Sequence, residues 1–405
     1  MTKLLEGIRV LEVAIYAFVP SAAAVLADWG ADVIKVEDPD VGDPVRGLSS
    51  YGFGPGDGGV SALWELFNRG KRSIGINIRK AEGREILMSL VDQSDVFLTN
   101  FMQPARARLG IDVDQILARN PRIIYGRGTG HGPVGPDADK GGFDALSYWG
   151  RPGAGSAAMA PGDTMPVLMP GPAFGDMQCG MHLAGGILGA LYRREKTGKG
   201  GVVDVSLLGS GLWAMAASTA GAYVLKSENI VQLDRRRAPN PIANIYATAD
   251  GRGFYLGMLE ADRYWPGLCR AVGLAGLADE ARFATSPLRA ANSEALIAIF
   301  DELFSRLTLA QVSERLNSQE GPWAVVGRPA DVLTDEQALM NGYVQMVACG
   351  DDARLPMVTA PVQYDQDVPA LSRAPGHGEH TDEVMTALGH DMDDLIRLKV
   401  AGVIN

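Results

Sequence analysis

Short runs rich in valine and isoleucine alternate with helical patterns along the first half of the chain. The runs at 8–14 (IRVLEVA) and 32–37 (DVIKVE) flank a small-residue helix predicted at 20–29. The same alternation continues through the apolar runs at 73–78, 95–100, 122–128 and 202–208. Continuous apolar strands separated by helices indicate a parallel sheet that is covered on both faces. We therefore predict an open α/β domain of the Rossmann type.

The pattern changes in the second half of the 405 residues. Residues 247–258 predict a two-stranded hairpin that turns at Asp250-Gly251, and helical patterns follow it. We expect a smaller α+β domain at 225–330. The large domain is then discontinuous along the chain, because it is built from 1–215 and 335–405.

The composition excludes several function classes. The formal charge is −11, from 37 Lys and Arg against 48 Asp and Glu, and an acidic chain is a poor general binder of nucleic acid or anionic membrane. Three scattered cysteines indicate neither a disulfide framework nor a metal site, and the five histidines show no paired-ligand spacing. The longest apolar run, about 181–192, is too short to span a bilayer. We expect a cytoplasmic protein without a metal, a nucleic-acid partner or a membrane.

The usual nucleotide-binding signatures are missing from this fold. The strand at 8–14 is followed by IYAFVP in place of GxGxxG, and no GxxxxGK[ST] loop occurs. The fold class by itself therefore assigns no function.

Asp176 is the first candidate for chemistry. It lies between Gly175 and a helix predicted to begin near Met177, where free backbone N–H groups stabilise an anion. Such a carboxylate is either a nucleophile or acid–base group, or only a cap of the helix. Cys179 follows one turn later, and a small buried thiol is its expected role.

Two basic clusters could bind phosphate. Lys71 and Arg72 stand at the start of a predicted strand, and Arg106 and Arg108 lie just beyond the carboxyl end of the strand at 95–100. Ligands bind at that edge of open α/β sheets. Solvated surface charge is the alternative for each of them.

Several longer motifs, in order along nearly the whole chain, resemble the class III CoA-transferases. This family includes formyl-CoA and carnitine CoA-transferases and the α-methylacyl-CoA racemases. The motifs are LEGIRVLEVA, LADWGADVIKVE, FNRGKRSIGINI, NPRIIYGRGTGHGPVGP, GDMQCGMHLAGGILGALYRREKTGKG and GEHTDEVMTALG.

The resemblance implies roles for individual residues. It makes Asp176 the nucleophile, which is acylated by an acyl-CoA and then carries CoA as a β-aspartyl thioester before transfer to an acceptor carboxylate. It implies that coenzyme A is the co-substrate and that the chain forms an interlocked homodimer. The residues implied to contact CoA are Lys71, Asn100, Phe101 and Arg108, and those implied to line the acyl end are Tyr16, Ala17 and Phe18.

The chain departs from the family at informative positions. Racemases of the family have a His before the Asp of a GHD-like segment, whereas this chain has Phe143 before Asp144. Phe143 cannot exchange an α-proton, which argues against a racemase, while Asp144 remains as a second carboxylate. Ala17 and Asp38 replace the Gln and Arg of formyl-type enzymes, and the glycine-run loop is absent from 225–260.

These departures and the apolar residues at the entrance, which include Trp149, predict a bulky hydrophobic or aromatic acyl group rather than a small polar acid. Two alternatives stay open at this point. One is an acyl-CoA racemase or other isomerase on the same scaffold, and the other is a non-catalytic acyl-CoA-binding protein.

Overall fold

The computed structural model describes residues 3–48, 60–228, 230, 234–350 and 353–405. The chain forms two compact units. The first contains residues from 1–156, 167–229 and 336–405, and the second contains residues from 157–166 and 230–335. The short segment 157–166 groups with the second unit, which no sequence pattern indicated.

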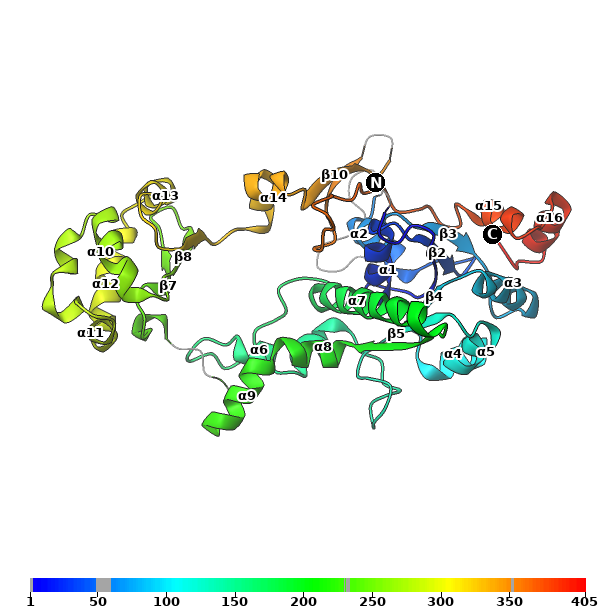
Figure 1. The fold of residues 1–405 in the computed structure, drawn as a ribbon, viewed down its shortest axis with the longest axis horizontal. Coiled ribbons are helices and arrows are strands. Elements are labelled where there is room, and N and C mark those ends of the chain that lie inside the picture. The colour runs from blue at the N-terminus through cyan, green and yellow to red at the C-terminus, as the bar shows by residue number, and fades with distance from the viewer. Residues whose placement is uncertain (1–2, 49–59, 229, 231–233, 351–352) are drawn as a thin grey trace. The chain divides into compact units, whose positions relative to one another are not determined.

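The first unit is built on six parallel strands in the order β3-β2-β1-β4-β5-β6 (Figure 1). This is the strand order of the Rossmann fold, and it confirms the predicted fold class. The order reverses between β1 and β4, so the ligand crevice of such a sheet lies at the carboxyl ends of these two strands. The strands are β1 (Arg9–Val13), β2 (Asp32–Glu37), β3 (Arg72–Gly75), β4 (Val96–Thr99), β5 (Ile124–Thr129) and β6 (Gly201–Ser206).

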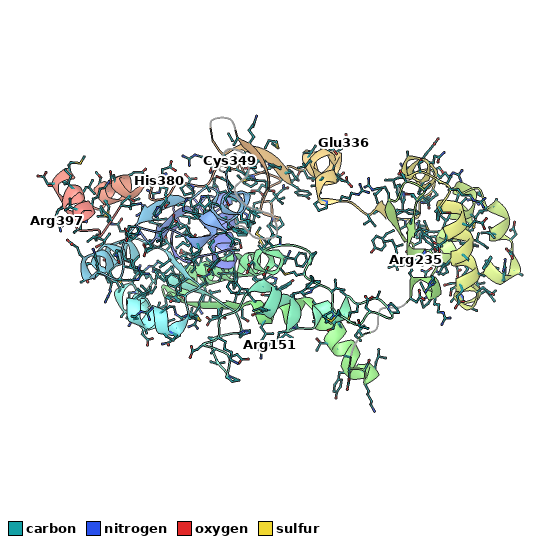
Figure 2. The ribbon with its side chains drawn as sticks, turned by 180° about the vertical axis from the view of Figure 1, so that it is seen from behind. Arg151, Arg235, Glu336, Cys349, His380 and Arg397 are labelled. Carbon is teal, nitrogen blue, oxygen red and sulfur yellow. The ribbon has the colours of Figure 1, made fainter. Side chains whose placement is uncertain are left out.

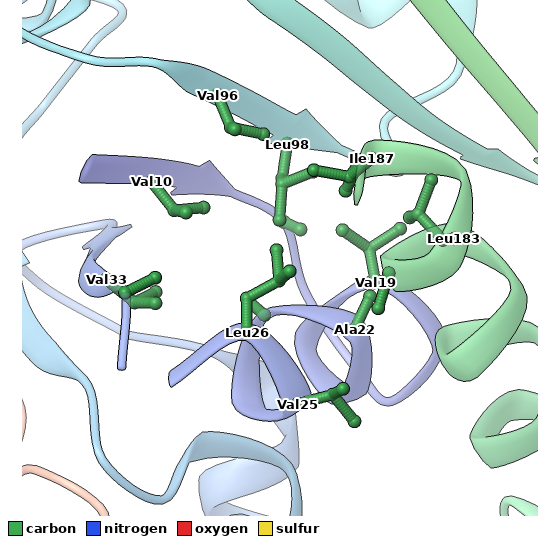
Figure 3. Packing of buried hydrophobic residues seen from close by; sticks show 14 of the residues in the cluster. Val10, Val19, Ala22, Val25, Leu26, Val33, Val96, Leu98, Leu183 and Ile187 are labelled. Carbon is green, nitrogen blue, oxygen red and sulfur yellow. The ribbon is translucent and has the colours of Figure 1, made fainter. Parts of the chain in front are cut away.

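Helices cover both faces of this sheet. Alternate strand residues point to opposite faces. Val96 and Leu98 therefore pack with α1 and α7 (Figure 3), while Phe97 belongs to the core on the other side of the sheet. The helices of the first face are α1 (Phe18–Asp28) and α7 (Phe174–Thr197). Those whose side chains join the core of the second face are α3 (Ala81–Asp92), α4 (Gln103–Leu109), α5 (Val113–Arg119), α15 (Thr381–Ala387) and α16 (Met392–Val400).

The close contact between α1 and α7 depends on Gly180. A Cβ atom at this position would lie 2.0 Å from Ser21 Oγ and 3.0 Å from the backbone nitrogen of Ala22. Both separations are shorter than van der Waals contact, so a larger residue would push the helices apart. The contact fixes the first turns of α7 against α1, and Ser21 Oγ donates a hydrogen bond to the Asp176 carbonyl at 3.4 Å.

The remaining elements of the first unit connect these layers or complete its edge. The hairpin of β10 (Val344–Ala348) and β11 (Arg354–Val358) precedes α15, whose N-terminal flank is joined to β3 by a bond from the His380 N–H to the Ser73 carbonyl (Figure 2). The others are η1 (Pro44–Gly47), α2 (Ala62–Asn68), η2 (Ala145–Gly150), α6 (Ala154–Ala157), α8 (Leu207–Ala214), α9 (Ala216–Leu225) and α14 (Glu336–Met340).

The second unit has its own core around a three-stranded antiparallel sheet in the order β7-β8-β9. The predicted hairpin is present, and Gly251 at its turn has a φ of +69°. Arg235, labelled in Figure 2, forms an ion pair with Asp301 inside this unit. The elements are η3 (Arg235–Arg237), β7 (Ala243–Ala247), β8 (Gly253–Gly257), α10 (Ala261–Ala271), η4 (Ala275–Ala278), η5 (Ala281–Phe283), α11 (Ser286–Ala291), α12 (Ser293–Phe304), α13 (Leu309–Leu316), β9 (Trp323–Val325) and η6 (Pro329–Thr334).

No helix among the described residues is both long and apolar enough to cross a membrane. Within the same ranges, no group of three or more His, Cys, Asp or Glu side chains is placed to hold a metal ion.

Candidate active site

The loop after β1 is held by the side chain of Asn100, which directly follows the neighbouring strand β4. The Ile15 N–H donates to Asn100 Oδ1 at 3.1 Å, and Asn100 Nδ2 donates to the Ile15 carbonyl at 2.6 Å. The next residue, Tyr16, has a φ of +66°, a conformation that residues with a Cβ rarely adopt. Ala17 then leads into α1. Asn100 therefore fixes the backbone of this loop at the point where the strand order reverses.

A cavity of about 530 Å³ opens beside this loop, and we call it the acid cavity. It contains Asp176, the candidate nucleophile. It brings together residues from the ends of β1 and β4, the segment before η2, and α7. The other predicted site residues that line it are Tyr16, Ala17, Phe18, Asn100, Phe101 and Phe143.

A second cavity of about 300 Å³ continues from the first, and we call it the sheet-edge cavity. Ile15, Phe101 and Ala105 line both cavities, so the two adjoin. The walls of the sheet-edge cavity are mostly aliphatic, while Arg79 and Arg108 add two exposed cations. Three carboxylates also line it, and each is already paired with a cation: Glu37 with Arg46, Asp38 with Arg79 and Asp43 with Lys35. An apolar slot with cations at its rim suits a flat ring system that carries phosphates.

The two cations of the sheet-edge cavity differ in their partners. Arg108 makes no ion pair with any residue in the described ranges, whereas Arg79 Nη1 lies 2.7 Å from Asp38 Oδ2. Arg79 was not among the predicted site residues. Its position in the sequence could have identified it, because it follows β3 and so lies at the carboxyl edge of the sheet.

Lys71 requires a correction, because its surroundings do not fit a direct contact with CoA. Its side chain is fully buried, and Nζ lies 2.6 Å from Glu12 Oε2 while donating to the Pro20 carbonyl and Asn68 Oδ1. All three ammonium donors are therefore used inside the protein. Burial also lowers the pKa of Lys71 to about 8. Lys71 precedes β3 and so lies at the amino end of this strand, whereas ligands bind at the carboxyl ends of the strands.

Asp176 lies inside the first turn of α7 rather than before it. The helix begins at Phe174, three residues earlier than expected, because Ala173 takes a left-handed φ of +59° and starts the helix without a side-chain cap. Asp176 is half-buried, and its carboxylate accepts no hydrogen bond from the described residues. Since the carboxylate caps nothing, it is available to a ligand in the acid cavity.

A second carboxyl group lies near the first. Burial, and then the charge of Asp144, raise the pKa of Asp176 to about 8. Asp144 is itself buried, which raises its own pKa, although the backbone N–H groups of Ala145, Gly175 and Asp176 act in the opposite direction. The Ala145 N–H donates to Asp144 Oδ1 at 2.8 Å, while Asp144 Oδ2 is buried without a hydrogen-bond partner among the described residues.

Aromatic side chains surround the mouth of the acid cavity. The rings of Tyr16 and Phe143 meet edge to face with centroids 5.8 Å apart, and Phe143 is 57% exposed. Trp149 does not line the cavity, but it packs on Phe174 in the first turn of α7 at 6.0 Å. Phe18 lines the cavity and is otherwise part of the core. The rim can therefore contact an apolar group.

Cys179 is fully buried one turn after Asp176. Burial raises the pKa of its thiol to about 12, and the nearby carboxylates of Asp176 and Asp144 act in the same direction. A neutral thiol in the core is a poor nucleophile, so Asp176 is the reactive candidate of this turn.

Comparison with known proteins decides the family. Residues 5–381 match the family model described as CoA-transferase family III. This chain belongs to CoA-transferase family III. It is therefore a class III CoA-transferase, an enzyme that uses CoA thioesters as co-substrates.

Curated relatives of this class III CoA-transferase span its full length. The (R)-2-hydroxy-4-methylpentanoate CoA-transferase of Clostridioides difficile is 31% identical over 402 residues, covering 99% of both chains. The cinnamoyl-CoA:phenyllactate CoA-transferase of Clostridium sporogenes is 28% identical over 98% of this chain and 96% of the relative. A solved CAIB/BAIF family protein from Brucella suis superposes with a TM-score of 0.80 at 29% identity, over 96% of this chain and 100% of that chain.

Proposed function

We propose that this CoA-transferase works through covalent catalysis by Asp176 on bulky hydrophobic or aromatic acids. The observation that carries the proposal is the half-buried Asp176 carboxylate, which has no partner among the described residues and lines a cavity of sufficient size for an acid. An Asp that only capped α7 would spend its oxygens on backbone N–H groups. The racemase alternative lacks support, because Phe143 stands where a proton-transferring His would be needed.

The reaction begins with attack of an Asp176 oxygen on the thioester carbonyl of the donor. The C–S bond breaks, CoA leaves as a thiolate, and a mixed acyl–aspartyl anhydride remains. The thiolate then attacks Cγ of Asp176, the anhydride C–O bond breaks, and the donor acid leaves as its carboxylate. The enzyme now carries a β-aspartyl-CoA thioester.

The second half reverses these steps with another acid. The acceptor carboxylate attacks the aspartyl thioester and releases the thiolate, and a second anhydride forms. The thiolate attacks the acceptor acyl carbonyl and expels the Asp176 carboxylate. No proton is consumed and the thioester energy is conserved, provided that water is kept from the anhydrides.

The assignment of cavities follows from their chemistry. We assign the phosphate-bearing part of CoA to the sheet-edge cavity, with Arg108 and Arg79 as its cations, and the thioester to the acid cavity beside Asp176. Phe101 lies at the junction, where the linking arm of CoA would pass. Two of the relatives are named for branched or aromatic acids, which agrees with the aromatic rim formed by Tyr16 and Phe143.

Intact-mass spectrometry after incubation with acyl-CoAs tests the proposal. We expect an adduct equal to one CoA less one water, located at Asp176 by peptide mapping and removed by the acceptor acid. Asp176→Ala abolishes both the adduct and turnover, whereas Glu195→Ala, an exposed carboxylate near the other end of α7, changes neither. Turnover that survives in Asp176→Ala contradicts the proposal.

A homodimer is the second part of the proposal. Helix α9 has no buried residue, although its sequence AASTAGAYVL is almost entirely apolar or small. Trp213, Tyr223 and Leu225 are 76%, 87% and 70% exposed. An apolar patch of this kind marks a contact surface between proteins. We expect light scattering to show that the wild-type protein is a dimer. The double variant Trp213→Lys with Tyr223→Lys should weaken this dimer. A wild-type monomer at micromolar concentration contradicts the proposed dimer.

We also propose that the enzyme acts in the cytoplasm. Cys179, Cys269 and Cys349 are all free thiols, which agrees with a reducing compartment. Cell fractionation with immunodetection tests this placement, and recovery of the protein outside the cytoplasmic fraction contradicts it.

A further inference from the structure

A network of fully buried charges lies directly behind the loop that borders the acid cavity. Lys35 on β2 directs its ammonium group to Glu12 Oε1 at 2.7 Å and to Asp43 Oδ2 at 2.9 Å. Neither partner is exposed, and Lys35 has no exposed surface. Lys35 Nζ donates hydrogen bonds to Glu12 Oε1 and, at 2.8 Å, to the Ala14 carbonyl, while its contact with Asp43 Oδ2 is an ion pair without hydrogen-bond geometry. One lysine therefore connects two carboxylates to the backbone of the loop.

Asp43 binds the next part of the same loop. Its Oδ1 accepts the N–H of Tyr16 at 3.1 Å and that of Val45 at 3.0 Å. The backbone N–H of Asp43 donates to Glu37 Oε2 at 2.9 Å. Asp43 is thus fixed at its backbone by Glu37 and at its carboxylate by Lys35, while it holds Tyr16.

The residue that is held is the strained one. Tyr16 has a φ of +66° without being glycine, a conformation that costs free energy and persists only where the surroundings enforce it. The Tyr16 ring meets Phe143 at the rim of the acid cavity, and Tyr16 lines the cavity that contains Asp176. A relaxed φ would turn the ring and the start of α1 away from their present places.

Stability alone does not account for this network. Buried ion pairs recover their desolvation cost only with good geometry, and well-packed apolar residues often do as well or better. A geometric role does account for the network. Lys35 binds the Ala14 carbonyl and Asp43 binds the Tyr16 N–H, so the loop is held on both sides of Ile15.

We propose that Asp43 and Lys35 are positioning residues that hold Tyr16 in its left-handed conformation and so place the aromatic rim opposite Asp176. Neither residue touches the reacting atoms. The anchor itself is a property of the free protein, and its effect on turnover rests on the proposed function.

Hydrogen exchange at the Tyr16 amide tests the anchor without any substrate. In Asp43→Ala we expect this amide to exchange faster by about tenfold, as for the loss of one buried hydrogen bond. Asp43→Asn keeps the Oδ1 acceptor for the Tyr16 N–H but turns its amide NH2 towards the Lys35 ammonium, so it should restore only part of the protection. Asp28→Ala is the matched control, because Asp28 forms a comparably buried ion pair outside this loop. The distance from Asp28 Oδ2 to Arg69 Nη2 is 2.7 Å. Asp28→Ala should lower thermal stability and leave Tyr16 exchange unchanged.

Steady-state kinetics in two backgrounds test whether the anchor affects turnover. Tyr16→Ala removes the ring that the anchor is proposed to place, while alanine, unlike glycine, still resists a positive φ. We expect Asp43→Ala to lower kcat for an aromatic acid by about tenfold in the otherwise wild-type enzyme and to have little effect in the Tyr16→Ala background, where no ring is left to place. If Asp43 only stabilised the fold, Asp43→Ala would lower kcat equally in both backgrounds.

The outcomes separate the two proposals. Unchanged Tyr16 exchange in Asp43→Ala, or equal kinetic losses in both backgrounds, overturns the anchor. If Asp43→Ala does not fold, the anchor still predicts that Tyr16→Gly melts at a higher temperature than Tyr16→Ala, and equal melting overturns it. If exchange responds as expected but the wild-type enzyme transfers CoA to no hydrophobic acid, the anchor stands and the proposed function fails.

Discussion

The carboxyl group of Asp176 is held near that of Asp144, and burial together with this second carboxylate raises the pKa of Asp176 to about 8. Asp176 lies in the first turn of α7, where the helix dipole would favour an anion. Burial outweighs the dipole here. The nucleophile of the proposed mechanism is therefore mostly protonated at neutral pH in the free enzyme.

The pH dependence of kcat/KM follows from this pair. Because only the ionised carboxylate attacks, kcat/KM should rise roughly tenfold per pH unit below about pH 8 and level off above it. In Asp144→Asn the repelling charge is gone, so the inflection should move to lower pH. Steady-state rates measured from about pH 5.5 to about pH 9.5 give the pH profiles of the wild type and of Asp144→Asn. An inflection that does not move in Asp144→Asn contradicts the coupling.

The same pKa predicts that Asp176 destabilises the fold. The folded pKa of about 8 lies above the ordinary value of 3.8, so the folded state holds a proton that the unfolded state releases. Stability therefore falls as the pH rises from 3.8 towards 8. Asp176→Asn should raise the free energy of unfolding by about 2 kcal/mol or more at pH 8, and by less at pH 5.

Thermal and denaturant melts at the two pH values check this expectation. Glu195→Gln is the control, because Glu195 is an exposed carboxylate on the same helix and should show no gain that depends on pH. A less stable Asp176→Asn at pH 8 would mean that the carboxylate has a structural partner.

The two arginines of the sheet-edge cavity should control affinity for acyl-CoA. A charge-assisted bond to phosphate contributes about 1.5–3 kcal/mol, so Arg108→Ala should raise KM for acyl-CoA by about tenfold or more with little change in kcat. Arg79→Ala should have a smaller effect, since Arg79 already pairs with Asp38. Arg119→Ala is the control, because Arg119 is exposed and pairs with Asp92 outside both cavities.

Initial rates at low and moderate salt measure these KM values, and the Arg108 effect should shrink as salt screens the contact. If neither arginine variant changes KM at low salt, the phosphates of CoA do not occupy the sheet-edge cavity.

Phe143 should set the preference for large acyl groups. Loss of its edge contact with Tyr16 and of its own apolar surface in Phe143→Ala should lower kcat/KM for an aromatic acid by about tenfold. A short aliphatic acid, which cannot reach the rim, should lose little. Competition between the two acids in one reaction measures the ratio. Tyr255→Ala, at an exposed aromatic of the second unit, should leave the ratio unchanged. An equal loss for both acids contradicts a selective role.

Much of the fold could be predicted because apolar periodicity reports burial directly. The run 32–37 is β2 with the same bounds, and the hairpin at Asp250-Gly251 follows from its turn residues. The start of α7 could not be predicted as well. Ala173 has no side chain that could cap the helix, and an alanine in the sequence does not indicate a left-handed φ.

Several of the predicted residues that line the two cavities follow strands, whereas Asp176 lies within helix α7. Asn100 and Arg108 come after β4, and both line a cavity at the carboxyl edge of the sheet. The contact between Lys71 and CoA is not a sound prediction, because a basic motif looks the same before and after a strand, whereas Arg79, which follows β3, lies at that edge. The anchoring of Tyr16 by Asp43 joins loops far apart in the sequence and leaves no local pattern.

An isotope-transfer experiment tests the covalent role of Asp176 most directly. With an acceptor acid labelled with ¹⁸O in both carboxylate oxygens, the mechanism passes one labelled oxygen through the second anhydride to the Asp176 carboxylate. After many turnovers, mass spectrometry should find ¹⁸O in the peptide that contains Asp176, and no other peptide should carry it. Label that appears in the released donor acid while Asp176 stays unlabelled would mean direct transfer between the two acids, and it would contradict the account.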